Sequence, residues 1–248
     1  MSGHSKWATI KHKKGAADKA RGKLFAKLAR QIEVAARQGG GDVDANPTLR
    51  TVVLKAKSAQ MTKDAIDRAI KRGIGEADST NYESITYEGY APGGVAMLID
   101  VLTDNRNRTA SDVRSAFTKY GGAMAEPGAV GWQFSRKGVI LIDGGIDEDT
   151  ALTAALDAGA EDMSRDGDSW RVVTDPAVVY EVRDQLQSAG IQVQSAESTM
   201  VSSTVIEVTD PADAKQVLRI MDTLEDNDDV QDVYANFDIA ESIMQEVG

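Results

Sequence analysis

The chain changes its charge and its hydrophobic period at nearly the same place, between residues 75 and 82. Residues 1–75 hold 17 Lys and Arg against 6 Asp and Glu, a net charge of +11, whereas residues 76–248 hold 11 against 33, a net charge of −22. Apolar residues recur at helical spacing before this point, and from about Tyr82 they alternate with polar ones, as in strands. We therefore expect a helical domain that attracts polyanions and an α/β part that repels them.

The composition sets the number of domains and excludes several classes of protein. A chain of 248 residues exceeds the usual size of one domain, so two or three are expected. The absence of Cys excludes disulfides, thiol nucleophiles and Cys-ligated zinc, and favours the cytoplasm. The polar, basic N-terminus and the lack of an apolar run near twenty residues predict neither a signal peptide nor a membrane span. With no large apolar stripe expected at the surface, we predict a monomer without a membrane partner.

The basic part is expected to contain a mobile arm and three short helices. Residues 1–22 have no hydrophobic period and are rich in Lys, which is typical of a solvated basic arm. The spacing of apolar residues within 23–79 predicts three amphipathic helices. Glycines at 39–41 end the first helix, Asn46 followed by Pro47 begins the second, and Thr62 begins the third. This part is therefore predicted to be a three-helix domain.

Two α/β domains are predicted after the helices. A strand at 130–142 begins the element order β-α-β-β-α-β of residues 133–200, which is typical of a ferredoxin-like fold. Residues 201–240 give a strand at 204–208, a helix and a further strand, and residues 80–132 would supply the elements that they lack. We therefore predict an α + α/β multidomain protein. An N-terminal three-helix domain is followed by two ferredoxin-like α/β domains, of which 133–200 is inserted in the discontinuous one.

The arm carries the sharpest binding signal. Lys11, Lys13 and Lys14 flank His12, and lysines neutralise phosphates without needing a fixed geometry. Trp7 offers a stacking face for an unpaired base, which suits RNA better than a closed duplex. The alternative is a solvated tail whose Trp packs on the helical domain. The charge split favours contact with nucleic acid.

A polar loop at 103–109 lies between the end of a predicted strand and the start of a helix. Helix N-termini attract anions, and Arg106 and Arg108 would add guanidinium groups suited to phosphate or to guanine edges. The alternative is that Asn107 or Thr109 caps the helix while the arginines pair with local acids. Seven polar residues exceed what a cap requires, so we favour a binding role.

A tyrosine pair lies beside a Gly-rich turn in residues 87–94. Tyr87 and Tyr90 could stack bases, but a hairpin whose tyrosines pack on the sheet is the favoured interpretation. The segment is neither a P-loop nor a dinucleotide-binding fingerprint, because the required Gly and Lys spacing is missing.

Acidic residues cluster at 147–149 and at 225–229. Neither cluster fits the calcium-loop pattern, since the required glycine and terminal glutamate are missing. A solvated helix end is favoured over a docking surface for a basic ribosomal protein.

The sequence offers little for an enzyme to use. The only histidines, His4 and His12, lie in the arm, where nothing orients them, and no metal-ligand spacing is present. We therefore predict a protein without catalytic residues, metal or cofactor.

Four segments carry a resemblance to a known family. They are MSGHSKWATIKHKKGAADKARGKLFAKLARQI, the helix start at Asn46, Pro47, Leu49 and Arg50, the turn YEGYAPGGVA and the loop TDNRNRT. Together they resemble the YebC/PmpR family, which includes the mitochondrial translational activator of a cytochrome oxidase subunit. The resemblance runs nearly end to end and implies three domains, one α/β domain interrupting the other. Members are described either as cytoplasmic DNA-binding transcriptional regulators or as ribosome-acting proteins that ease translation of proline-rich stretches.

Two functions fit these patterns. The first is a ribosome-associated translation factor that binds rRNA and tRNA, with ribosomal proteins as further partners, and acts by positioning. The second is a transcriptional regulator whose helix at 62–72 reads promoter DNA, although no helix-turn-helix spacing or dimerisation heptad is evident. We favour the first, because the acidic α/β part disfavours wrapping along duplex DNA. A protein-docking module would leave the basic arm unexplained.

The candidate nucleic-acid-binding residues come from the arm, the three helices and the polar loop. They are Lys6, Trp7, Lys11, His12, Lys13, Lys14, Lys19, Arg21, Lys23, Arg50, Lys55, Lys57, Lys63, Arg68, Lys71, Arg72, Asn105, Arg106, Asn107 and Arg108.

Overall fold

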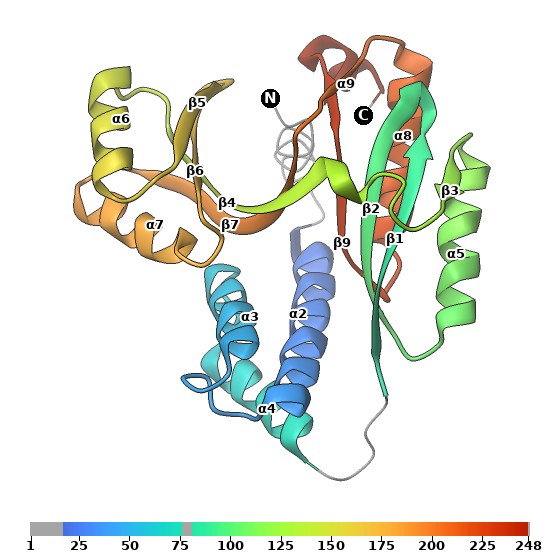
Figure 1. The fold of residues 1–248 in the computed structure, drawn as a ribbon, viewed down its shortest axis with the longest axis horizontal. Helices are drawn as coiled ribbons and strands as arrows, with labels where there is room; N and C mark the ends of the chain where they lie inside the picture. Colours follow the sequence, from blue (N-terminus) through green and yellow to red (C-terminus); the bar gives the residue numbers. More distant parts are fainter. Residues whose placement is uncertain (1–16, 76–80, 248) are drawn as a thin grey trace. The chain divides into compact units, whose positions relative to one another are not determined.

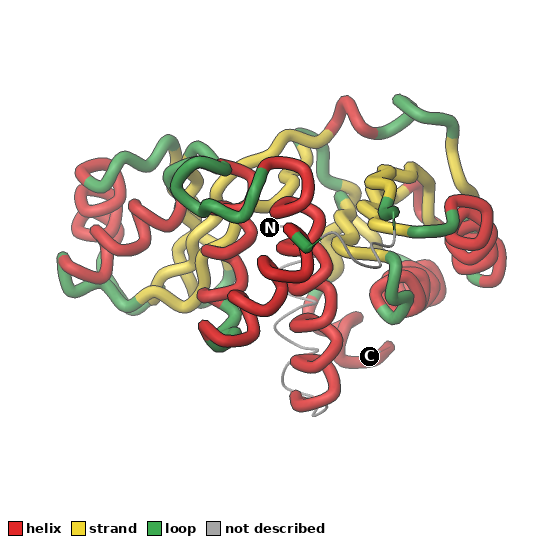
Figure 2. Tube along the Cα trace, turned by 90° about the horizontal axis from the view of Figure 1, so that it is seen from below, coloured by secondary structure: helices red, strands yellow, loops and turns green. Residues whose placement is uncertain are grey.

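The structure, a computed structural model, describes residues 17–75 and 81–247. The predictions for Lys6, Trp7 and the cluster at 11–14 lie outside the described residues. The chain forms two compact units, one of residues 135–201 and one of the segments before and after it, and each is described by itself. Both units contain helices and strands, and the N-terminal region is helical (Figures 1 and 2). The protein is therefore of mixed α and β class.

Three helices form the N-terminal region: α2 (Ala17–Gly39), α3 (Pro47–Ser58) and α4 (Lys63–Ile74). Their apolar faces meet in one core, which includes Leu28, Ile32, Leu49, Val53 and Ile66. Burial of these aliphatic side chains supplies most of the stability of such short helices.

The helix starts follow from local side-chain chemistry. The side chain of Asn46 accepts a hydrogen bond from the N–H of Leu49, and that of Thr62 accepts one from Ala65, so both predicted starts are confirmed. The first helix differs, because it already begins at Ala17, within the stretch predicted to be an arm. Alanine, lysine and arginine favour helix by intrinsic propensity, so this turn forms without an apolar period.

The larger unit contains a four-stranded sheet of strand order β3-β1-β2-β9. Its strands are β1 (Glu83–Ala91), β2 (Val95–Thr103), β3 (Ala123–Ala125) and β9 (Val230–Ala235). Strands β1 and β2 form the predicted antiparallel hairpin, joined by a 3-10 turn at Pro92–Gly94. Gly93 and Gly94 have φ values of 75° and 79°, a backbone conformation that glycine adopts without a steric cost.

Two long helices cover this sheet and build its core. Helices α5 (Arg106–Lys119) and α8 (Pro211–Glu225) contribute Phe117 and Met221 to a cluster that also contains Met97 and Ile99 of β2. All residues of β2 except Asp100 are buried, as expected for a central strand. The short helix α9 (Glu241–Val247) adds Met244 to the same core.

Two predicted strands differ in the structure. The strand at 204–208 does not join the main sheet, because β8 (Ile206–Val208) pairs in parallel with β10 (Phe237–Ile239) in a separate two-stranded sheet. The neighbours of β2 in the main sheet are β1 and β9, and β1 lies there because a tight turn brings consecutive strands together at little entropic cost. The strand expected at 130–142 begins only at Phe134, because residues 131–133 form a 3-10 turn.

The smaller unit has the element order β-α-β-β-α-β. Its elements are β4 (Phe134–Asp143), α6 (Glu148–Asp157), β5 (Asp162–Asp166), β6 (Ser169–Thr174), α7 (Val179–Ser188) and β7 (Val193–Ser202), and the strands lie in the order β5-β6-β4-β7. Ile140 and Ile142 of β4, Val172 of β6 and Leu186 of α7 are fully buried. Over the described part of the chain, no helix has the length and hydropathy needed to cross a membrane.

Candidate nucleic-acid interface

The acidic segment at 225–232 contacts the chain's own basic helices. The Nζ of Lys23 lies 2.7 Å from a carboxylate oxygen of Asp226, and that of Lys55 lies 3.1 Å from Asp232. Lys27 donates to the backbone oxygen of Glu225 at 2.8 Å, and burial lowers the pKa of its amino group while the Glu225 charge counteracts this. The prediction of a purely solvated helix end is therefore wrong for this segment. It neutralises the cations of α2 and α3 that face it.

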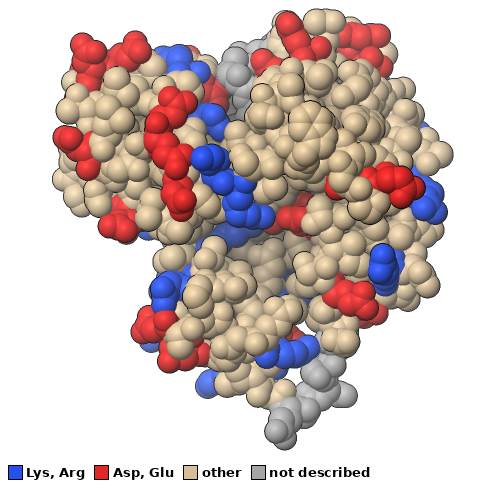
Figure 3. Space-filling model, in the orientation of Figure 1, with Lys and Arg blue, Asp and Glu red and all other residues tan. Residues whose placement is uncertain are grey.

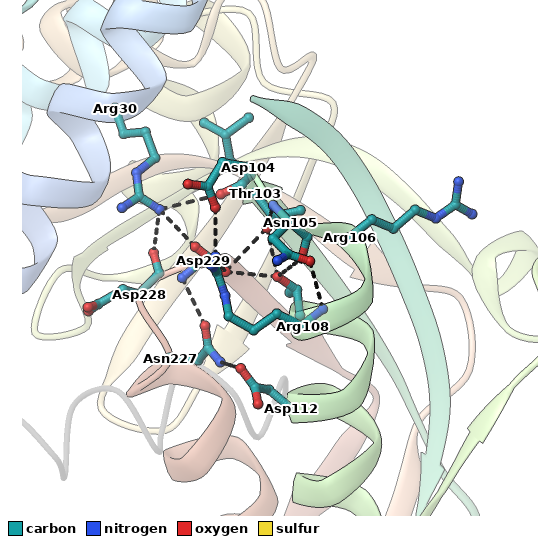
Figure 4. Close-up of polar contacts among 12 residues, drawn as sticks. Arg30, Thr103, Asp104, Asn105, Arg106, Arg108, Asp112, Asn227, Asp228 and Asp229 are labelled. Atoms are coloured by element: carbon teal, nitrogen blue, oxygen red, sulfur yellow. Dashed lines mark hydrogen bonds and ion pairs between the residues drawn. The ribbon is translucent and has the colours of Figure 1, made fainter. Parts of the chain in front are cut away.

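Asp229 is the most connected acid of this segment (Figure 4). Its buried carboxylate accepts hydrogen bonds from Arg108 at 2.7 Å and Thr109 at 2.8 Å, and Arg30 of α2 lies 3.3 Å away. Burial by itself would raise the pKa of this carboxyl, but these hydrogen bonds and the two positive charges hold its pKa below the ordinary value. One carboxylate thus connects α2, the start of α5 and the start of β9.

The polar loop at 103–109 contains the N-cap of helix α5 and two arginines in different environments. The N-cap is Asn105, whose side chain accepts from the N–H of Arg108 at 3.1 Å, and not Asn107 or Thr109 as the alternative had it. Arg108 pairs with Asp104 at 2.8 Å as well as with Asp229, as the same alternative expected. Arg106 is exposed and extends away from this cluster in Figure 4. Only Arg106 of the two therefore presents its guanidinium group to solvent without a carboxylate on it among the described residues.

The hairpin motif at 87–94 is organised by a buried glutamate. The carboxylate of Glu88 accepts hydrogen bonds from the backbone N–H groups of Gly128, Val130 and Gly131, at 2.7, 2.6 and 2.9 Å. Burial alone would raise the pKa of Glu88, but these three donors lower it below its ordinary value. Glu88 therefore fixes the segment at 126–131, which the sequence pattern had assigned partly to a strand.

Two aromatic side chains beside this segment face solvent. Trp132 is 73% exposed and Tyr90 is 40% exposed. Tyr87, by contrast, is half-buried against the sheet, so the favoured interpretation of packed tyrosines holds for Tyr87 and not for Tyr90. Sequence reasoning missed Trp132 because it lay in an expected strand. The turn residues Pro127 and Gly128 just before it were the available signal.

Comparison with known proteins identifies the family. The model described as "TACO1/YebC protein N-terminal domain" matches residues 5–76, and the model described as "TACO1/YebC second and third domain" matches residues 82–237. The chain belongs to the TACO1/YebC family. The resemblance to YebC proteins found in the sequence motifs is therefore confirmed.

Relatives of this TACO1/YebC chain match it over its whole length. Proteins from Citrifermentans bemidjiense and Rubrobacter xylanophilus are 52% and 55% identical to it, cover 100% of this chain, and are covered over 100% and 99% of their own length. Both carry the description "Probable transcriptional regulatory protein". A solved structure also matches, the crystal structure of a conserved hypothetical protein from Aquifex aeolicus. The two sequences are 43% identical, and the structures superpose with a TM-score of 0.75 over 89% of this chain and 91% of that one.

The predicted contact residues of the TACO1/YebC chain fall into two groups. The first group binds oxygen atoms of the chain itself. Lys23, Lys55, Arg72 and Arg108 pair with carboxylates, and Arg50 donates to the backbone carbonyls of Val43 and Asp44. The exposed side chains of the others contact no carboxylate within residues 17–75 and 81–247: Arg21, Lys57, Lys63, Arg68, Lys71 and Arg106. Asn107 is exposed and Asn105 is the cap. Lys19 lies in α2, and its side chain is outside the described set.

The surface over helices α3 and α4 carries separate basic patches. On the face shown in Figure 3, blue Lys and Arg patches over α3 and α4 alternate with red acidic ones. Within the described ranges, no group of three or more His, Cys, Asp or Glu side chains is placed to hold a metal ion.

Proposed function

We propose that this chain is a non-enzymatic, nucleic-acid-binding regulator of gene expression that acts at the ribosome in the cytoplasm. It binds rRNA and tRNA and eases elongation through difficult, proline-rich stretches. The observation that carries the proposal is the division of the helical cations. Those facing the acidic segment are neutralised by it, whereas Lys57, Lys63, Arg68 and Lys71 are exposed without such a partner in the described chain.

Exposed cations of this kind suit a phosphate backbone. Each Lys or Arg that neutralises a phosphate releases a counterion, which gives affinity without needing a fixed geometry. The arm at 1–14 adds four more Lys residues to this end of the chain. Because the rest of the chain carries a net charge of −22, it is repelled by a second stretch of duplex, which favours an end-on contact with a folded RNA.

The proposed mechanism is positional. A protein anchored on rRNA through its helical region can hold the acceptor end of a tRNA and the nascent chain close to the reactive geometry, which lowers the entropic part of the barrier. Arg106, at the exposed start of α5, is the proposed tRNA contact of the α/β part. No bond is made or broken by this chain in that scheme.

The second candidate is a DNA-binding transcriptional regulator, which the description of the relatives favours. It would present α4 to the major groove, with Lys63, Arg68 and Lys71 exposed and Asp67 beside them. Helix α4 is basic enough for phosphate contact, but its exposed residues lack the Asn and Gln that read adenine bidentately.

In-cell crosslinking followed by sequencing of the attached nucleic acid separates the two candidates. We expect peaks in large-subunit rRNA and tRNA, which Lys63→Glu with Lys71→Glu would weaken. Lys215→Glu with Arg219→Glu on α8 is the matched control, because it makes the same charge change at exposed positions elsewhere. Peaks confined to a few promoter DNAs would overturn the ribosomal proposal in favour of the second candidate.

We also propose that the unit of residues 135–201 has the ferredoxin-like fold. The strand order β5-β6-β4-β7 supports it, because the first and last strands of that fold are neighbours while the second lies at an edge. The larger sheet has a different arrangement, with β1 beside β2, so the proposal is limited to the smaller unit.

A further inference from the structure

Trp132 is the most exposed of the large hydrophobic side chains in the described chain, at 73%. Burying an indole stabilises a fold considerably, so a Trp left in solvent forgoes that contribution. Its polar edge is nevertheless held, because Nε1–H donates to the backbone oxygen of Ala129 at 3.1 Å. The ring is thus anchored at its edge, and its faces are left for a ligand.

The backbone on both sides of Trp132 is fixed. The preceding residue, Gly131, donates its N–H to Glu88, and a Cβ on this glycine would lie 3.2 Å from that carboxylate. The following residue, Gln133, accepts at its backbone oxygen from the N–H of Ser203 at 2.8 Å. An aromatic side chain held in this way loses little conformational entropy when it binds, which is the condition for a preorganised site.

A second ring is anchored at the same point. The hydroxyl of Tyr90, from strand β1, donates to the same oxygen of Ala129 at 3.3 Å. Tyr90 is 40% exposed, so a second aromatic side chain reaches solvent there. The Glu88 carboxylate is buried and accepts three backbone N–H donors, so the segment does not offer a bare carboxylate from Glu88 to a polyanion.

We propose that Trp132, assisted by Tyr90, is a stacking platform for an unpaired base of RNA. The site is the size of one or two rings, which suits a base and is far smaller than the roughly 800 Å² that each partner contributes to a stable protein interface. Base stacking on an aromatic ring tolerates any sequence, as a factor acting on many transcripts requires. This inference rests on the proposed function and names where an unpaired base binds the α/β part.

The test uses the full chain and a fluorescein-labelled single-stranded RNA dodecamer, read by anisotropy. Stacking contributes about 1–3 kcal/mol per base, so Trp132→Ala should weaken binding by about 5- to 150-fold. Trp132→Phe should retain most of the affinity, because the phenyl ring still stacks. Leu156→Ala, at a 53% exposed position of α6, is the control and should bind like the wild type. Thermal unfolding of each variant checks that it folds.

Two changes of the RNA make the test specific. A duplex of the same sequence should show no difference between wild type and Trp132→Ala, because its bases are already stacked. An RNA with abasic residues should bind wild type and Trp132→Ala equally. Equal losses for the single strand, the duplex and the abasic RNA would overturn the stacking role.

The failures of this inference and of the proposed function are distinguishable. If RNA binds and Lys63→Glu with Lys71→Glu weakens it, but Trp132→Ala does not, the platform is wrong and the proposed function stands. If the wild-type protein binds no RNA, both are overturned.

Discussion

The Nη2 atom of Arg108 lies 2.7 Å from the Oδ2 atom of Asp229, although 121 residues separate them in the chain. Arg108 belongs to the polar loop that suggested anion binding, and Asp229 belongs to the acidic cluster that suggested a solvated helix end. The guanidinium group of Arg108 and the carboxylate of Asp229 therefore bind each other. The cluster at Asp229 organises the start of α5, and the neighbouring Arg106 keeps its exposed position.

Replacing Asp229 by Asn should destabilise the protein. The substitution leaves Arg108 and Arg30 without their shared carboxylate and weakens the hydrogen bond from Thr109, which should lower the free energy of unfolding by about 1–3 kcal/mol. Urea denaturation measures this change. Asp228→Asn is the control, because Asp228 is exposed and Arg30 contacts only its backbone oxygen. Equal effects of the two substitutions would contradict the role given to Asp229.

Glu88→Gln should both destabilise the protein and flatten its response to acid. The pKa of Glu88 in the folded protein lies below its ordinary value, so its contribution is present at neutral pH and is lost as the pH falls from about 4. An amide in its place carries no charge for the three N–H donors and does not titrate. We expect the free energy of unfolding to drop by about 1–3 kcal/mol at pH 7, with less further loss between pH 5 and pH 3.

Guanidinium is unsuitable for that measurement because it screens charges, so urea unfolding at each pH is the method of choice. The pKa of Asp229 is also lowered in the folded protein, and Asp229 remains in the variant. Some loss of stability in acid is therefore still expected. A variant whose pH dependence equals that of the wild type would show that Glu88 does not hold the turn through its charge.

The ion pair between Lys55 and Asp232 should be worth about 0.2–1 kcal/mol, because both side chains are about one third exposed. Lys55→Asp and Asp232→Lys should each destabilise the protein, and the swap that combines the two should recover part of the loss. A double-mutant cycle on the free energy of unfolding gives the coupling directly. A coupling of zero at low salt would mean that this pair does not help to hold the helical region.

The salt dependence of RNA binding should separate exposed lysines from neutralised ones. For single strands, each Lys that contacts a phosphate contributes about 0.7 to the slope of log affinity against log salt. Lys63→Ala and Lys71→Ala should each reduce the slope by about that amount, whereas Lys55→Ala should leave it nearly unchanged, because Asp232 already neutralises Lys55. Filter binding between 50 and 300 mM salt measures the slopes. Equal slopes for all three variants would contradict the distinction between exposed and neutralised lysines.

Local patterns in the sequence determined most of the elements and the charge division. Asn46 and Thr62 begin helices because their side chains cap the next turn, and Pro92–Gly94 turns the chain because glycine adopts positive φ. The family could also be recognised from four segments, and the matches to the two family models and to full-length relatives bear this out. These features depend on residues within a few positions of one another, which a single sequence records.

Only the tertiary structure decided which charges remain exposed and which ring faces solvent. Lys55 and Lys63 look alike in the sequence, yet Asp232, far away in the chain, neutralises only the first. Trp132 lies in an apolar stretch that reads as strand, yet it is exposed beside a turn whose backbone N–H groups bind Glu88, some forty positions away in the chain. The reason is physical: periodicity reports the local backbone, whereas pairing and exposure depend on which distant segments the folded core brings together.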